Sequence, residues 1–74
     1  MDDAQLKAAI DTGLEWWCHA RYAFAANPAK HYLGMAVGDR IRCLPRESGW
    51  WPADNAGAHG CVPRKYLALD RPVT

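Results

Sequence analysis

Residues 47–51 read Glu-Ser-Gly-Trp-Trp, and residues 60–66 read Gly-Cys-Val-Pro-Arg-Lys-Tyr. Two adjacent tryptophans follow a Ser-Gly turn, and the short strand predicted nine residues further on ends at Pro63 with Tyr66 close behind it. The 74-residue chain contains only 4 Trp, 3 Tyr and 1 Phe, so this concentration of rings is hard to assign to a core alone. We interpret the rings as part of a ligand-binding surface on a compact all-β domain.

The segments around this stretch alternate in polarity and are separated by turn signals, which is typical of short strands. We predict a single helical turn at residues 63–66 and a long loop at residues 25–37. Pro52 cannot donate to a ladder, so we expect it at a sheet edge or a bulge. Five short strands in about 55 residues favour a small β-barrel or sandwich. The predicted strands are residues 16–24, 40–44, 50–53, 60–62 and 67–69.

The first 15 residues predict an amphipathic helix at residues 2–15, in which Asp2 or Asp3 can cap the first turn. A helix of this length is marginal alone in water, so its apolar stripe must pack on something. It either covers an open end of the following domain, which we favour, or occupies the binding surface. We divide the chain into a helix at 1–16, a barrel at 17–70 and a tail at 71–74. The stripe consists of Leu6, Ala9, Ile10, Gly13, Leu14 and Trp17.

The composition disfavours several classes of protein. An 8.3 kDa domain has one thin core and little room for an enclosed catalytic pocket. The three histidines lie far apart in sequence without an evident orienting acid, so we expect no enzyme and no cofactor. No apolar run approaches the roughly 20 residues that span a bilayer. The acidic start does not resemble a secretory signal, which predicts a cytoplasmic protein.

Cys18, Cys43 and Cys61 are an odd number of cysteines at wide spacing. Because no CxxC pair is present, a zinc site would need scattered ligands, and a disulfide framework would leave one thiol over. We interpret all three as small buried hydrophobic residues in a reducing compartment, and we expect no metal.

Charge is unevenly distributed along the chain. Residues 1–15 carry four carboxylates against one lysine, a net charge of −3, and residues 16–74 carry eight Lys or Arg against four carboxylates, a net charge of +4. The acidic and basic parts could therefore contact one another. The basic excess and the rings also keep nucleic-acid binding open as an alternative. That role is disfavoured because the basic residues are scattered and the pI is only about 7.8.

Four motifs in order resemble the Src homology 3 (SH3) family. Residues 20–24, Ala-Arg-Tyr-Ala-Phe, are similar to its Ala-Leu-Tyr-Asp-Tyr opening. Residues 33–35 and 38–39 resemble its Leu-Ser-Phe segment and Gly-Asp/Glu turn. Residues 50–51 match its paired tryptophans, and residues 60–67 resemble its Gly-x-hydrophobic-Pro-x-Asn-Tyr-Val end. The resemblance covers most of the chain, without the N-terminal helix.

The resemblance implies a five-stranded SH3-like barrel with an N-terminal α-helical extension. It also implies a module that docks proline-rich peptides, whose polyproline II helix places prolines between aromatic ridges. The partner would be a proline-rich segment of another protein or of the same chain, and self-association stays open. By motif position the peptide-binding residues would be Tyr22, Phe24, Trp50, Pro63 and Tyr66, while Trp51 would be structural.

The long loop departs from the family because residues 25–37 contain no carboxylate and carry Lys30 and His31 instead. An Arg or Lys of a ligand would find only Glu47 as a nearby acid. We therefore expect neutral or acidic proline-rich peptides to bind better than Arg-flanked ones. A structural role, in which the acidic helix masks the groove, is the alternative.

Overall fold

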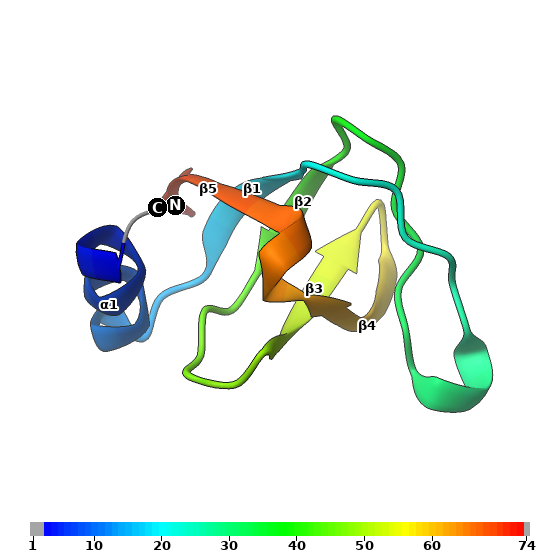
Figure 1. The fold of residues 1–74 in the computed structure, drawn as a ribbon, viewed down its shortest axis with the longest axis horizontal. Coiled ribbons are helices and arrows are strands. Elements are labelled where there is room, and N and C mark those ends of the chain that lie inside the picture. The colour runs from blue at the N-terminus through cyan, green and yellow to red at the C-terminus, as the bar shows by residue number, and fades with distance from the viewer. Residues whose placement is uncertain (1–2, 74) are drawn as a thin grey trace.

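The computed structural model describes residues 3–73 of the 74-residue chain. Five antiparallel strands form one sheet in the order β4-β3-β2-β1-β5, which curves around a shared core (Figure 1). This architecture, preceded by one helix, confirms the predicted fold class. The strands are β1 (Trp16–Ala20), β2 (Arg40–Cys43), β3 (Trp50–Asn55), β4 (Ala58–Pro63) and β5 (Leu67–Pro72).

The helix α1 (Asp3–Thr12) is shorter than the predicted span of residues 2–15. It ends early because Gly13 has a φ of +67°, a left-handed conformation that suits glycine and stops the helix. Asp2, the other candidate for the helix cap, lies outside the described residues. Ala9 is fully buried in the hydrophobic core and Leu6 packs against it, so this part of the stripe is anchored to the barrel. Gly13, Leu14 and Trp17 lie beyond the helix, and Leu14 is exposed.

The core lies inside the curved sheet. Trp51 is its largest fully buried side chain, and its indole N–H donates to the Arg46 carbonyl oxygen at 2.8 Å. The buried ring therefore keeps a partner for its polar atom, which avoids the cost of an unsatisfied donor. Around Trp51 the buried core includes Leu33, Met35, Ile41, Cys43, Ala53 and Val62.

Two strand boundaries differ from the prediction by three or more residues. β1 ends at Ala20, four residues early, and the chain then turns so that the Arg21 N–H donates to the Tyr66 carbonyl oxygen at 2.7 Å. β5 continues to Pro72, and its last residues pair with Trp16 and Trp17. This strand is three residues longer than the predicted strand at residues 67–69, because pairing with β1 extends it.

Pro52 lies inside β3, which has a neighbouring strand on each side, and not at a sheet edge. The ladder between β2 and β3 is short, with Cys43 opposite Ala53 near its end. Beyond β2 the Leu44 N–H donates to the Pro52 carbonyl oxygen at 2.9 Å. The missing N–H of proline thus falls where the ladder with β2 ends, and this position explains why the strand tolerates it.

The turn before β2 is held by one carboxylate. Asp39 Oδ2 accepts the Ala36 backbone N–H at 2.9 Å and the Asn55 side-chain amide at 3.1 Å. Hydrogen bonds to the ionised form, first from Ala36 and then from Asn55, lower the pKa of Asp39 below its ordinary value of 3.8. Asn55 ends β3, so this carboxylate ties the turn to the β3–β4 hairpin.

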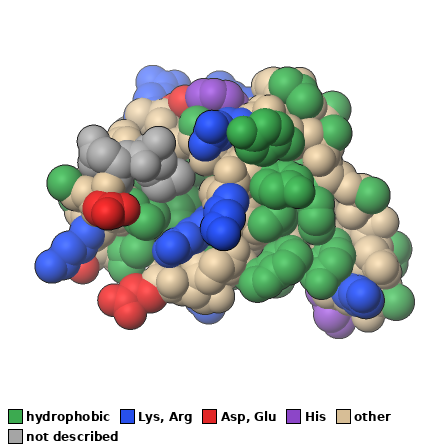
Figure 2. Space-filling view, viewed as in Figure 1, with side chains coloured by type: hydrophobic (Ala, Val, Ile, Leu, Met, Phe, Trp, Pro, Cys, Tyr) green, Lys and Arg blue, Asp and Glu red, His purple; other side chains and the backbone are tan. Residues whose placement is uncertain are grey.

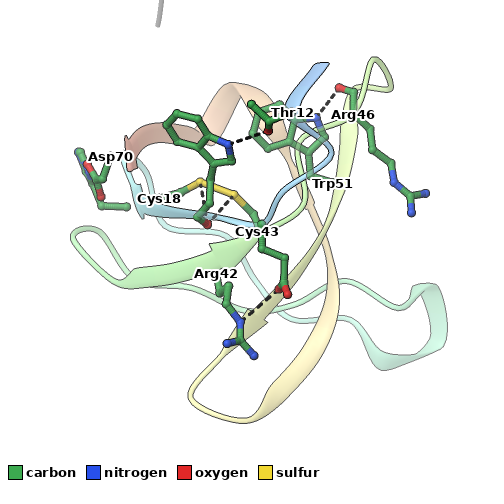
Figure 3. Close-up of a disulfide and its surroundings, with 10 residues drawn as sticks. Thr12, Cys18, Arg42, Cys43, Arg46, Trp51 and Asp70 are labelled. Carbon is green, nitrogen blue, oxygen red and sulfur yellow. Dashed lines mark hydrogen bonds and ion pairs between the residues drawn. A yellow bond between two sulfur atoms is a disulfide. The ribbon is translucent and has the colours of Figure 1, made fainter. Parts of the chain in front are cut away.

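Cys18 and Cys43 form a disulfide between neighbouring strands β1 and β2 (Figure 3). Both residues are buried as predicted, but the interpretation of all three cysteines as thiols was wrong. Antiparallel pairing places Cys18 beside Ile41 and Cys43 beside Trp16, with 6.7 Å between the two cysteine Cα atoms. Cys61 alone stays free. Structural disulfides are rare in the cytosol, so this bond does not support the expectation of a reducing compartment.

Candidate functional site

Five aromatic rings and one proline come together on one face of the barrel. We call this set the ring cluster; it consists of Tyr22, Phe24, Tyr32, Trp50, Pro63 and Tyr66. The Tyr22 and Tyr66 ring centroids are 5.4 Å apart, and those of Phe24 and Tyr66 are 5.6 Å apart. Both pairs meet edge to face, which is a favourable arrangement of aromatic quadrupoles.

The barrel backbone positions these rings from three separate segments. Tyr22 and Phe24 follow β1, and Phe24 is held by two backbone hydrogen bonds with Met35, at 2.9 and 3.0 Å. Trp50 begins β3 directly opposite Pro63 of β4. Tyr66 ends the short 3-10 helix η2 (Arg64–Tyr66). Each segment is fixed by ladder or turn hydrogen bonds, so the ring cluster is preorganised.

Much of the ring cluster is open to solvent. Tyr22 is 50% exposed and Trp50 is 40% exposed, whereas the adjacent Trp51 is fully buried. Alternation along β3 explains the difference, since successive side chains point to opposite faces. Within residues 3–73 no atom accepts a hydrogen bond from the Trp50 indole N–H. That donor is free to bind a ligand carbonyl.

Tyr32 belongs to the cluster, although the sequence did not single it out. Its ring stacks on that of Trp50 with 4.6 Å between centroids and only 8° between planes, and it lies 5.5 Å from Phe24. The long loop, which contains the 3-10 helix η1 (Pro28–Lys30), folds back to hold it. Tyr32 bridges to Asn27 within the loop and to Cys61 of β4. The one sequence signal was an aromatic residue directly before the Leu33-Gly34-Met35 motif.

The charges nearest to the rings are positive. The Arg21 guanidinium lies 5.4 Å from the Tyr22 ring centroid and donates to the Tyr22 hydroxyl at 3.4 Å. The Lys30 ammonium lies 6.0 Å from the Tyr32 ring centroid. Figure 2 shows basic side chains directly beside a band of hydrophobic side chains on this face. A cationic ligand group would therefore approach like charges here.

Glu47, the one acid expected near the rings, lies elsewhere. It lines a shallow pocket with Arg64 and the α1 residues Leu6 and Ile10. Its backbone carbonyl accepts the Arg64 guanidinium at 3.3 Å. The structure thus brings together five of the six predicted site residues and places Glu47 beside the helix.

The helix does not cover the rings. Figure 1 places α1 at the opposite end of the molecule from the loop that carries η1. Its described side chains line pockets together with Arg21, Arg64 and Glu47, while Tyr22 and Trp50 stay exposed. Residues 3–12 therefore leave Tyr22 and Trp50 exposed, which does not favour the alternative in which the helix masks the groove.

Other kinds of site find no support in the described part of the chain. Among residues 3–73, no three His, Cys, Asp or Glu side chains gather where they could hold a metal ion. Within the same range, no helix is both long and apolar enough to cross a bilayer.

The fold and the exposed rings define a small β-barrel of the kind that serves as a protein-interaction module. No protein-family model and no curated protein matches the sequence, but solved structures do. One is the C-terminal SH3 domain of myosin IB from Entamoeba histolytica bound to an EhFP10(GEF) peptide. It is 33% identical with a TM-score of 0.65, and the match covers 77% of this chain and 83% of that one.

A second structure of the same myosin SH3 domain is 32% identical with a TM-score of 0.64, and the match covers 78% of this chain and 95% of that one. This likeness confirms the family that the motifs predicted, and the chain belongs to the SH3 family. SH3 domains are non-enzymatic modules of protein interaction.

Proposed function

We propose that this chain docks proline-rich segments of other proteins, in the polyproline II conformation, on the ring cluster. The observation that carries the proposal is Trp50, which presents an unpartnered indole N–H among rings whose centroids lie within 6.1 Å of its own. A polyproline II ligand has no internal hydrogen bonds, so its carbonyl groups are free to accept that donor.

Each residue has a distinct role in this proposal. Tyr22, Phe24 and Tyr66 line the first groove for a proline, and Trp50 and Pro63 wall the next one. Glu47 is left out of the site because it faces α1. The chain acts by binding alone and carries out no catalysis.

We also propose a charge preference, in which neutral or acidic proline-rich peptides bind better than Arg-flanked ones. Arg21 and Lys30 lie beside the rings, and Tyr32 covers one side of Trp50. A ligand guanidinium would lack a carboxylate partner and would meet like charges at both ends of the cluster.

An NMR titration tests both proposals. The 15N-labelled chain is titrated with three peptides that share a proline-rich core and carry Arg, Glu or neither as flanks. Saturable shifts are expected at the Trp50 indole N–H, while the indole signals of Trp16, Trp17 and Trp51 serve as internal controls. No shift with any peptide would overturn the proposed function. Tightest binding of the Arg-flanked peptide would overturn only the charge preference.

A further inference from the structure

A shallow pocket of about 240 Å³ lies between α1 and the barrel, next to the ring cluster. We call it the basic pocket; it is lined by Asp3, Leu6, Arg21, Arg64, Lys65 and Leu67. Arg21 directly precedes Tyr22, and Lys65 directly precedes Tyr66, so the pocket borders the Tyr22 and Tyr66 end of the rings. The helix supplies one wall, which the barrel alone lacks.

The cations of the basic pocket have no carboxylate partners within the described residues. Among residues 3–73, neither Arg21 nor Lys65 forms an ion pair, and the Arg64 guanidinium donates to the backbone carbonyl of Glu47. Three cations therefore face one carboxylate, that of Asp3.

Two more acids nearby line a different pocket. Asp11 and Glu47 line the neighbouring pocket of about 330 Å³, which Asp3 and Arg64 share. Lys7 also lines that pocket, so three carboxylates there meet two cations, whereas three cations meet one carboxylate in the basic pocket. A ligand that leaves the Tyr22 and Tyr66 end on the Arg21 and Lys65 side meets an excess of positive charge.

The charge of the basic pocket and its closeness to the ring cluster both suit an acidic side chain of the ligand. Ion pairs in which Arg or Lys donates to a carboxylate are charge-assisted and stronger than neutral hydrogen bonds. Leu6, which is half-buried, adds apolar surface for the methylene groups of that side chain. A polyproline II segment advances about 3.1 Å per residue, so a residue two or three positions beyond the docked proline reaches this neighbourhood.

We propose that the N-terminal helix adds a binding subsite to the groove, the basic pocket, which takes a Glu or Asp side chain two or three residues beyond the proline docked at Tyr22 and Tyr66. The inference rests on the proposed function, because the ligand must first occupy the ring cluster. It assigns the acid preference to one end of the cluster and makes α1 part of the site.

The first experiment compares peptides that differ only in one acid. Peptides with a neutral proline-rich core carry Glu or isosteric Gln two or three residues beyond either end, and dissociation constants are measured with the full chain. At one end of the proline-rich core, the Glu peptide should bind about threefold to tenfold tighter than the Gln peptide. The substitution Lys65→Glu should abolish or reverse this ratio. The matched control Arg71→Glu, which changes net charge equally but lies outside both pockets, should retain most of it.

A second pair of variants tests the helix itself. Asp3→Asn removes the one carboxylate of the basic pocket and should raise the Glu-to-Gln ratio about twofold. Asp11→Asn, on the same helix but lining only the other pocket, should leave the ratio unchanged.

The outcomes separate the two proposals. If the neutral peptide binds but Glu and Gln peptides bind equally at both ends, the basic pocket is no subsite while the proposed function stands. The inference would also be overturned if the Glu-to-Gln affinity ratio stayed the same in Lys65→Glu. It would be overturned as well if Asp3→Asn and Asp11→Asn changed that ratio equally. If no peptide binds at all, both proposals fall.

Discussion

Trp50 and Trp51 are neighbours in β3, yet they occupy opposite environments. Trp50 stacks on Tyr32 at the surface, while Trp51 is buried and bonded to the Arg46 carbonyl oxygen. Each indole N–H has a different use, because one is open to solvent and the other satisfies a buried backbone acceptor. The same substitution at the two positions should therefore have opposite consequences.

Trp50→Phe keeps a ring to stack on Tyr32 but removes the N–H. We expect the affinity for proline-rich peptide to fall about fivefold to tenfold, the loss of roughly one hydrogen bond, with little change in stability. Trp51→Phe should instead lower the free energy of unfolding by about 1–3 kcal/mol and leave affinity nearly unchanged. Urea unfolding and NMR titration of both variants measure these effects. An equal effect of the two substitutions on affinity would contradict this division of roles.

At the scale of elements, β1 and β2 are joined by the Cys18–Cys43 disulfide (Figure 3). Both sulfur atoms lie within 3.8 Å of the Trp16 carbonyl oxygen, and the Trp16 indole N–H donates to Thr12 at the end of α1. The two cysteines are separated by 25 positions in sequence. A cross-link over a loop of this size restricts the unfolded chain more than the folded one.

Reduction of the disulfide should lower the free energy of unfolding by about 2–4 kcal/mol. Thermal unfolding with and without a reductant measures this change. The matched control is Cys61→Ser, which keeps the disulfide and should lose the same amount of stability on reduction. Alkylation of the denatured protein should label one cysteine before reduction and three after it. Labelling of all three without reductant would show that the bond is absent.

The turn before β2 depends on ionised Asp39. Because hydrogen bonds from Ala36 and Asn55 depress its folded-state pKa below the ordinary 3.8, this contribution to stability is present above that value. It is lost as the pH falls through the lower, folded-state pKa.

Asp39→Asn cannot titrate, so the variant should be less stable at neutral pH and should lose less stability between about pH 5 and pH 2. Melting temperatures across this range check the prediction. Asp70→Asn, whose partner is the exposed His19, is a control that should retain the decline due to Asp39. A decline as steep in Asp39→Asn as in the parent chain would contradict the assignment.

For the whole molecule, α1 contributes to the hydrophobic core of the barrel. Ala9 is fully buried within the same cluster as Ile41, Trp51 and Val62. A ten-residue helix would be marginal by itself in water, so its stability depends on that packing.

Helix and barrel should therefore unfold in one cooperative transition. Far-UV circular dichroism follows α1 and tryptophan fluorescence follows the barrel, and the two midpoints should coincide in urea. Ala9→Glu, which places a carboxylate in the core, should shift both midpoints together. Earlier loss of the helical signal would indicate that α1 is a separate unit.

The strands, the helix and most of the ring cluster were predictable because their signals are local. Alternation marked β2, turn residues marked the hairpin after Asn55, and the motifs containing Tyr22, Trp50 and Tyr66 indicated the family. The boundary errors at Ala20 and Pro72 arose where hydrogen bonds to distant strands, not local preference, end or extend an element.

Sequence alone thus predicted the SH3 fold and, by motif position in the resembling family, five residues of the candidate site, since each motif is a local stretch of chain. Tertiary structure decided the Cys18–Cys43 bond, the stacking of Tyr32 on Trp50, and the position of Glu47 beside α1. These features depend on which distant residues the curved sheet brings together. The basic pocket belongs with them, because its walls come from α1, η2 and β5 and no single segment reveals it.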